Sequence, residues 1–183
     1  MQSSSLTLNS ATVAPPSTSR IYSPAQLEIG RFALTARDDD ARVQSIVVNN
    51  IGTANLQSIS NSISSARLID ISAYQEISAT ATISGNTITF SSMSDTITKD
   101  TTKNYAIKLD VASVEPYYGK TITLATSTGG IMAVRSADST AIIPTGTSST
   151  KTYTLGVVSP IVMVTPINEN IFKVRITNPD TNT

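Results

Sequence analysis

The sequence predicts an all-β protein built as an antiparallel sandwich. Apolar and polar residues alternate all along the chain, and the helical period is nowhere sustained. Short apolar segments follow one another at intervals of 8–15 residues, separated by turns rich in Ser, Thr, Gly and Asn. The 27 threonines fit this fold, because a branched Cβ suits the pleat while the hydroxyl can face water. No helices alternate with the strands, which excludes a doubly wound α/β sheet.

The clearest predicted strand covers residues 103–112. One face carries Tyr105, Ile107, Leu109 and Val111, and the other carries Asn104, Ala106, Lys108 and Asp110. Such alternation is typical of an antiparallel strand with one buried and one solvated face. We also expect Lys103 and Lys108 to be exposed, where they would discourage pairing with other sheets.

Other strands follow from local signals. Residues 77–90 predict a hairpin that turns at Ser84-Gly85-Asn86. Residues 25–37 predict a strand with a bulge at Gly30-Arg31, where the apolar parity changes. Residues 42–49 predict a strand with Ile46 and Val48 on the face opposite Val43 and Val47. Further strands are expected at 66–71, 120–125, 130–134 and 151–158, and a short turn or helical crossing at 56–63.

The composition excludes several functional classes. The chain has 183 residues, 13 basic and 13 acidic side chains, and neither His nor Cys. It therefore has no His-ligated metal centre, Cys nucleophile, His general base or disulfide framework. No Ser-x-x-Lys occurs together with the supporting motifs of a Ser–Lys hydrolase, and no phosphate-binding loop occurs, so we expect no enzyme activity. The neutral charge balance argues against nucleic acid as a partner, and no apolar segment is long enough for membrane insertion.

The predicted domain organisation is one sandwich over residues 1–158, followed by a shorter piece over 159–183. Residues 171–177 echo residues 31–37: Phe172 lies 140 residues after Phe32, and Val174 and Ile176 keep the same offset from Leu34 and Ala36. Two interpretations stay open. The last segment is either the terminal strand pair of the same sandwich or the beginning of a second, similar module.

Residues 25–115 carry a resemblance to a known family. The resemblance lies in Phe32–Ala36, Val43–Ala54 with its Asn50-Ile51-Gly52-Thr53-Ala54 turn, Asn86–Phe90, and Ile97–Lys103. They resemble immunoglobulin-like β-sandwich modules repeated in large surface proteins of small-genome, mostly uncultured bacteria, although Asp100 stands where that family's turn often has Gly. The resemblance implies an immunoglobulin-like fold and a cell-surface, S-layer-like or adhesin-like setting. The N-terminus lacks signal-peptide features, so an exported protein would carry its signal elsewhere.

Asp38-Asp39-Asp40 is the densest carboxylate run and the candidate metal site. Ca²⁺ takes six to eight oxygen ligands, and adjacent Asp residues in a loop can supply several. The alternative is a solvated turn at a strand end, because Asp favours turns and Arg37 and Arg42 offset the charge. Calcium is the one cofactor that the sequence suggests.

Tyr117-Tyr118 is the candidate ligand-binding site. The pair follows the predicted strand 103–112 and precedes Gly119, so it lies in a loop. Exposed tyrosines can anchor a protein partner or stack on a sugar ring. The alternative is that one ring packs under the loop and the other lies at its edge.

Taken together, the sequence predicts a non-enzymatic structural module of an extracellular, cell-surface protein, serving as a spacer, stalk or assembly unit. Its expected partners are other surface-protein modules or further copies of itself. The alternative function is adhesion or ligand binding through the Tyr117-Tyr118 loop or the Asp38–Asp40 loop.

Overall fold

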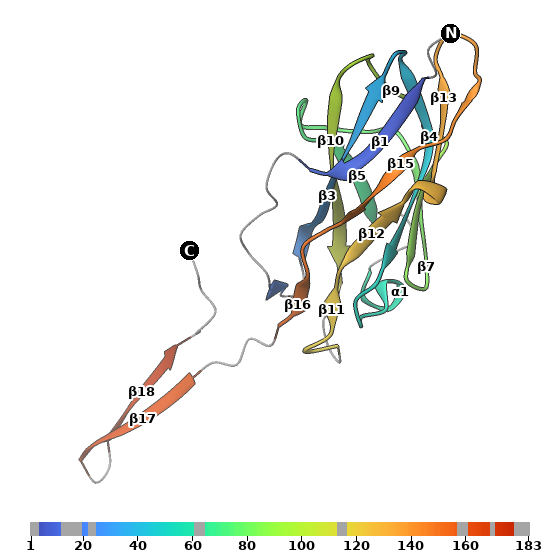
Figure 1. Ribbon diagram of the computed structural model, residues 1–183. Helices are drawn as coiled ribbons and strands as arrows, with labels where there is room; N and C mark the ends of the chain where they lie inside the picture. Colours follow the sequence, from blue (N-terminus) through green and yellow to red (C-terminus); the bar gives the residue numbers. More distant parts are fainter. Residues whose placement is uncertain are drawn as a thin grey trace.

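The structure is a computed structural model that describes residues 4–11, 20–21, 25–60, 65–112, 117–156, 161–168 and 171–177. Its main element is a 13-stranded mixed sheet that does not close on itself (Figure 1). The central path runs β14-β13-β4-β12-β15-β1-β3-β10-β5-β6. Off this path, β8 and β9 also pair with β4, and β7 pairs with β8. The all-β class predicted from the sequence is confirmed.

The sheet has two halves, which meet at β15. The first half contains β1 (Ser5–Ser10), β3 (Ala25–Arg37), β5 (Ala66–Asp70), β6 (Gln75–Glu76) and β10 (Thr102–Val111). The second contains β4 (Ala41–Asn50), β7 (Thr80–Ser84), β8 (Thr87–Ser91), β9 (Asp95–Ile97), β12 (Leu124–Ser127), β13 (Ile131–Arg135) and β14 (Ala141–Ile142). Strand β15 (Thr145–Ser149) pairs antiparallel with β12 and parallel with β1, so it joins the halves through backbone hydrogen bonds.

Smaller elements complete the described chain. The helix α1 (Leu56–Ile59) and the 3-10 turn η1 (Thr128–Gly130) connect strands of the main sheet. Strands β2 (Arg20–Ile21), β11 (Thr121–Ile122) and β16 (Tyr153–Leu155) form a three-stranded sheet. Strands β17 (Ile161–Asn168) and β18 (Ile171–Thr177) form a separate antiparallel pair.

Both halves of the sheet bury their apolar side chains in one core. The same cluster holds Leu8 and Phe32 from the first half and Ile46 and Phe90 from the second. The rings of Phe32 and Tyr105 stack with their centroids 5.0 Å apart, on neighbouring strands β3 and β10. A shared core of this kind is what the alternation of apolar residues predicts.

Several local predictions are confirmed. The hairpin forms from β7 and β8 and turns at Gly85-Asn86, and α1 supplies the short helical crossing. The bulge in β3 is also present. Ile107 pairs with Gly30 and Lys108 with Glu28, so the extra residue is Ile29, close to the predicted Gly30-Arg31 position.

Two predictions of side-chain burial are wrong. On β10, Ala106 and Asn104 were expected to face water, but they are only 2% and 8% exposed. The reason is that β10 lies between β3 and β5, where the larger cross-strand neighbours Arg31 and Ile69 flank Ala106. On β4, Val43 joins Ile46 in the core rather than lying opposite it. A bulge at Gln44, where Ser45 pairs with Met132 but Val43 with Ala133, shifts the parity.

We predict that Leu109→Asp abolishes cooperative folding. Leu109 is fully buried on the core face of β10, so an ionised carboxylate there would have no partner. The expected loss of unfolding free energy is about 4 kcal/mol or more, measured by urea denaturation followed by circular dichroism. The control is Lys108→Asp on the exposed side of the same strand, which should keep a cooperative transition. A stable, cooperative Leu109→Asp protein would contradict the core assignment.

We also predict that Gly146→Ala destabilises the protein while Gly129→Ala does not. Gly146 has a φ of +91°, and a Cβ added there would lie 2.2 Å from the carbonyl oxygen of Leu8, its partner across the β1–β15 pairing. Left-handed strain alone costs about 1–3 kcal/mol, and the clash adds to it. Gly129 has nothing within 4 Å of its added Cβ. Equal melting temperatures of the two variants would refute a close β1–β15 contact.

Candidate functional site

A cluster of three interacting charged groups, Lys103, Asp70 and Asp95, borders the seam where the sheet stays open. Lys103 lies at the start of β10, Asp70 at the end of β5 and Asp95 at the start of β9. Strands β5 and β10 belong to the first half of the sheet, and β9 pairs with β4 in the second. Their side chains therefore meet across the two halves.

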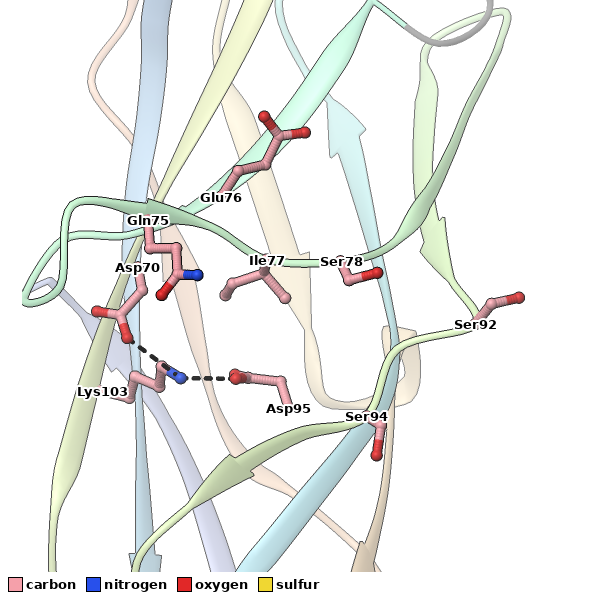
Figure 2. A pocket seen from close by; sticks show the side chains of 9 residues that line it. All are labelled: Asp70, Gln75, Glu76, Ile77, Ser78, Ser92, Ser94, Asp95 and Lys103. Atoms are coloured by element: carbon pink, nitrogen blue, oxygen red, sulfur yellow. Dashed lines mark hydrogen bonds and ion pairs between the residues drawn. The ribbon is translucent and has the colours of Figure 1, made fainter.

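Lys103 is held between the two aspartates. Its Nζ lies 2.6 Å from Asp95 Oδ1 and 3.2 Å from Asp70 Oδ2, and Figure 2 shows the ammonium pointing between the two carboxylates. The Lys103 side chain is only 20% exposed. The hydroxyl of Tyr105 donates to Asp95 Oδ2 at 2.7 Å, so both oxygens of Asp95 are engaged. The expectation that Lys103 is exposed is wrong, because Lys103 shares the core-facing parity of Tyr105 and Ile107.

The electrostatics of this cluster favour its ionised form. Burial would lower the pKa of Lys103, but hydrogen bonds and charge from Asp95 and then Asp70 outweigh burial and raise it. Burial likewise opposes ionisation of Asp70, yet the N–H groups of Ala73 and Ser72 and the Lys103 ammonium bring its pKa below the ordinary value. Burial and the negative charge of Asp95 raise the pKa of Tyr105 well above 10, so its hydroxyl stays a donor.

A polar hollow of about 290 Å³ adjoins the cluster. Its lining, shown in Figure 2, consists of Asp70, Gln75, Glu76, Ile77, Ser78, Ser92, Ser94, Asp95 and Lys103. Apart from Ile77, these side chains are polar or charged. The arrangement has a cation between two anions and hydroxyl groups nearby, but it lacks an imidazole or thiol that could act as a base or nucleophile. The groups Lys103 and Asp95 neutralise each other directly.

The structure places the three candidate metal residues in a turn between β3 and β4. Asp39 accepts hydrogen bonds from Ser4 at 2.8 Å and from Arg135 at 2.7 Å. Both contacts lower the pKa of Asp39, and the hydrogen bond from Ser4 has the larger effect. Asp40 accepts from the backbone N–H of Lys99 at 2.7 Å. Asp38 has a φ of +70°, a conformation that Asp tolerates in turns.

Asp39 and Asp40 line a hollow of about 390 Å³ together with Lys99, Ser136 and Ala137. In the described ranges, no group of three or more acidic residues is placed to hold a metal ion. Calcium binding by Asp38, Asp39 and Asp40 stays a prediction.

The two candidate tyrosines differ in their surroundings. Tyr117 packs against the hydrophobic core, whereas the Tyr118 ring is 37% exposed. The backbone of this turn is fixed by hydrogen bonds from Gly119 N to Leu155 O and from Lys120 N to Tyr117 O. This places one ring beneath the loop and one at its edge. Ligand binding by Tyr117 and Tyr118 stays a prediction, with Tyr118 the ring that a ligand could reach.

The sequence did not single out the Lys103 cluster. The three charged residues Asp70, Asp95 and Lys103 are 8 to 33 residues apart in the chain, and no motif links them. One signal was available: Lys103 has the same parity as Tyr105, Ile107 and Leu109, and a lysine on a core-facing register requires an acidic partner when it is partly buried.

Comparisons with known proteins do not identify a family. No protein-family profile and no curated protein matches the sequence. Among solved structures, the chain is similar to AvmM, which catalyses macrocyclization in alchivemycin A biosynthesis, with 8% identity and a TM-score of 0.39 over 85% of this chain and 88% of that one. It is also similar to a DUF4466 family protein from Parabacteroides merdae, with 14% identity and a TM-score of 0.36 over 97% of this chain and 55% of that one. Likeness at this level carries no functional argument.

We predict that Lys103→Met lowers the unfolding free energy by about 1–3 kcal/mol, because Asp70 and Asp95 then lose their shared cation. The measurement is urea denaturation near pH 7. The control is Lys108→Met, the same change on the exposed face of the same strand. The cluster is refuted as a stabilising contact if both variants unfold at the same urea concentration.

The cluster also predicts a pH dependence. The pKa of Asp70 is lowered in the folded protein. Its contribution to the free energy of unfolding is therefore complete above the ordinary pKa of 3.8 and is lost as the pH falls through the pKa of the folded state. The pKa of Lys103 is raised, so its contribution is complete below 10.5 and is lost as the pH rises through the folded value. The Lys103→Met variant should therefore lose less stability at alkaline pH than the unchanged protein does. Thermal melting across pH, for both proteins, measures this difference.

Proposed function

We propose that this chain is a non-enzymatic structural module of a bacterial cell-surface protein, with an immunoglobulin-like sandwich arrangement. One observation carries the structural part of the proposal: Lys103, Asp70, Asp95 and Tyr105 are engaged with one another across the two halves of the sheet. A catalytic or binding site keeps reactive groups available for a substrate, whereas these groups are used to hold strands together. The surface setting is supported by the family resemblance over residues 25–115.

The shape of the sheet supports the same role. Two halves share one apolar core, β15 joins them by backbone pairing, and Lys103 joins them by ion pairs. A spacer or stalk unit has to transmit force or keep a distance, which requires that its strands stay together. Among the described residues, no helix is long and apolar enough to cross a membrane.

Adhesion or ligand binding is the second candidate function. The exposed ring of Tyr118 and the hollow beside Asp39 and Asp40 are the features that favour it. This role differs from the structural one in a measurable way, because a ligand that binds only the folded protein raises its stability.

We predict no change in melting temperature when the purified chain is heated with calcium chloride, with a chelator, or with soluble oligosaccharides. A ligand at 100 times its dissociation constant would add about 2.7 kcal/mol, which corresponds to roughly 5–10 °C for a chain of this size. A calcium-dependent rise that Asp38→Asn, Asp39→Asn and Asp40→Asn together remove would contradict this prediction and would assign a calcium site to the turn. A rise with an oligosaccharide that Tyr118→Ala removes would do the same.

Light scattering and negative-stain microscopy of residues 1–183 separate the forms of the structural role. Growth into sheets or filaments as the concentration rises identifies an assembly unit. A monodisperse monomer identifies a spacer or stalk unit. Calcium-dependent growth would assign the Asp38–Asp40 turn to a metal-linked contact between copies, and Asp39→Asn is the variant that tests it.

A further inference from the structure

The pair β17–β18 repeats the register of the pair β1–β3. In the first pair, Leu8 lies opposite Leu34, Leu6 opposite Ala36 and Ser10 opposite Phe32. In the second, Val164 lies opposite Val174, Val162 opposite Ile176 and Pro166 opposite Phe172. Both pairs are antiparallel.

The match holds along the whole of β1. When β18 is aligned with β3 by their phenylalanines, the antiparallel register places Ile161–Pro166 where β1 has Ser5–Ser10. Leu6 and Leu8 then coincide with Val162 and Val164, so the two apolar positions of β1 are apolar in β17 as well, while Ile161 and Met163 stand where β1 has Ser5 and Thr7. A slip of one residue would put these positions on the other face of the hairpin. The connection differs, since β1 and β3 are joined by a long segment and β17 and β18 by a short one, but loops vary in length at little cost.

The two pairs differ in what lies beside them. In the main sheet, β3 also pairs with β10 and β1 with β15, and both partners come from later in the chain. Within the described residues, β17 and β18 form a sheet of two strands only. An isolated two-stranded hairpin is marginally stable in water, and its open edges are sites for further strands.

We propose that β17 and β18 are the first two strands of a second module, and that their outer edges take strands equivalent to β15 and β10 from a continuation of the same polypeptide. This inference deepens the proposed structural role and rests on it for its biological meaning: the protein would be a tandem array, with modules repeating about every 140 residues. The occupant follows from the register, because the same strand pair in the first module recruits its neighbours from downstream residues.

The first test uses residues 1–183 and a chain ending at residue 156. We expect the amides of 161–177 to exchange with solvent far faster than those of β1 and β3, and we expect both chains to melt at the same temperature. Slow exchange of 161–177, together with a lower melting temperature of the shorter chain, would overturn the proposal, because the hairpin would then complete the first sandwich.

The second test supplies the missing strands. The chain through Thr177 is extended with residues 38–156, so that β17 and β18 precede a second set of all later strands. We expect a second cooperative unfolding transition and slow exchange of the amides of 171–177. The control is an authentic tandem, residues 1–160 followed by 4–156. If the control shows two folded units and the extended chain shows one, β17 and β18 are not equivalent to β1 and β3.

Paired substitutions in the extended chain test the register itself. Val174 corresponds to Leu34, which is fully buried, and Arg175 corresponds to Thr35, which is half-buried on the other face. Val174→Asp should remove the second transition, and Arg175→Asp should leave it. Equal effects of the two variants would overturn the register. None of these measurements involves a ligand or assembly, so their failure is distinguishable from failure of the proposed function.

Discussion

The rest of the structure depends on one constraint, which is that the two halves of the sheet must stay folded over a common core. Each half has an apolar face that must be buried against another element, and the core of Phe32, Tyr105, Ile46 and Phe90 is where the two faces meet. Two contacts of different kinds hold them. On one side, β15 joins β1 to β12 through the backbone. At the open seam, Lys103 and Tyr105 contact Asp95.

The two contacts place different demands on the sequence. The β1–β15 contact needs a residue without a side chain, because a Cβ added at Gly146 would lie 2.2 Å from the carbonyl oxygen of Leu8. The contact at the open seam depends on the charges of its side chains rather than on their shape. An apolar pair at the start of β10 would pack equally well against several neighbours, whereas Lys103 fits only where Asp70 and Asp95 converge. We infer that the cluster fixes which strand ends meet, in addition to its contribution to stability.

Much of the fold could be predicted from the sequence, because it rests on local alternation. The hairpin of β7 and β8, the strand β10 and the bulge beside Gly30 all have signals within a few residues. Burial of Ala106 and the bulge at Gln44 had none, since they depend on which strands lie beside β10 and β4. The charged contacts at the seam could not be predicted for the same reason. Asp70, Asp95 and Lys103 come from three strands, and only the strand order brings them together.

The seam also bears on the proposed structural role, because the strand edges of an open sheet are not all paired. A closed barrel satisfies all its edges, so it can join its neighbours only through loops. Among the described strands, β6 and β14 end the central path and are two residues long, which limits pairing at those edges, while the five-residue β7 pairs only with β8. The charged cluster covers the remaining opening between β5 and β9 with groups that prefer each other to an incoming strand. At β6 and β14 the main sheet thus presents only short edges, whereas both outer edges of the two-stranded pair β17–β18 are unpaired among the described strands.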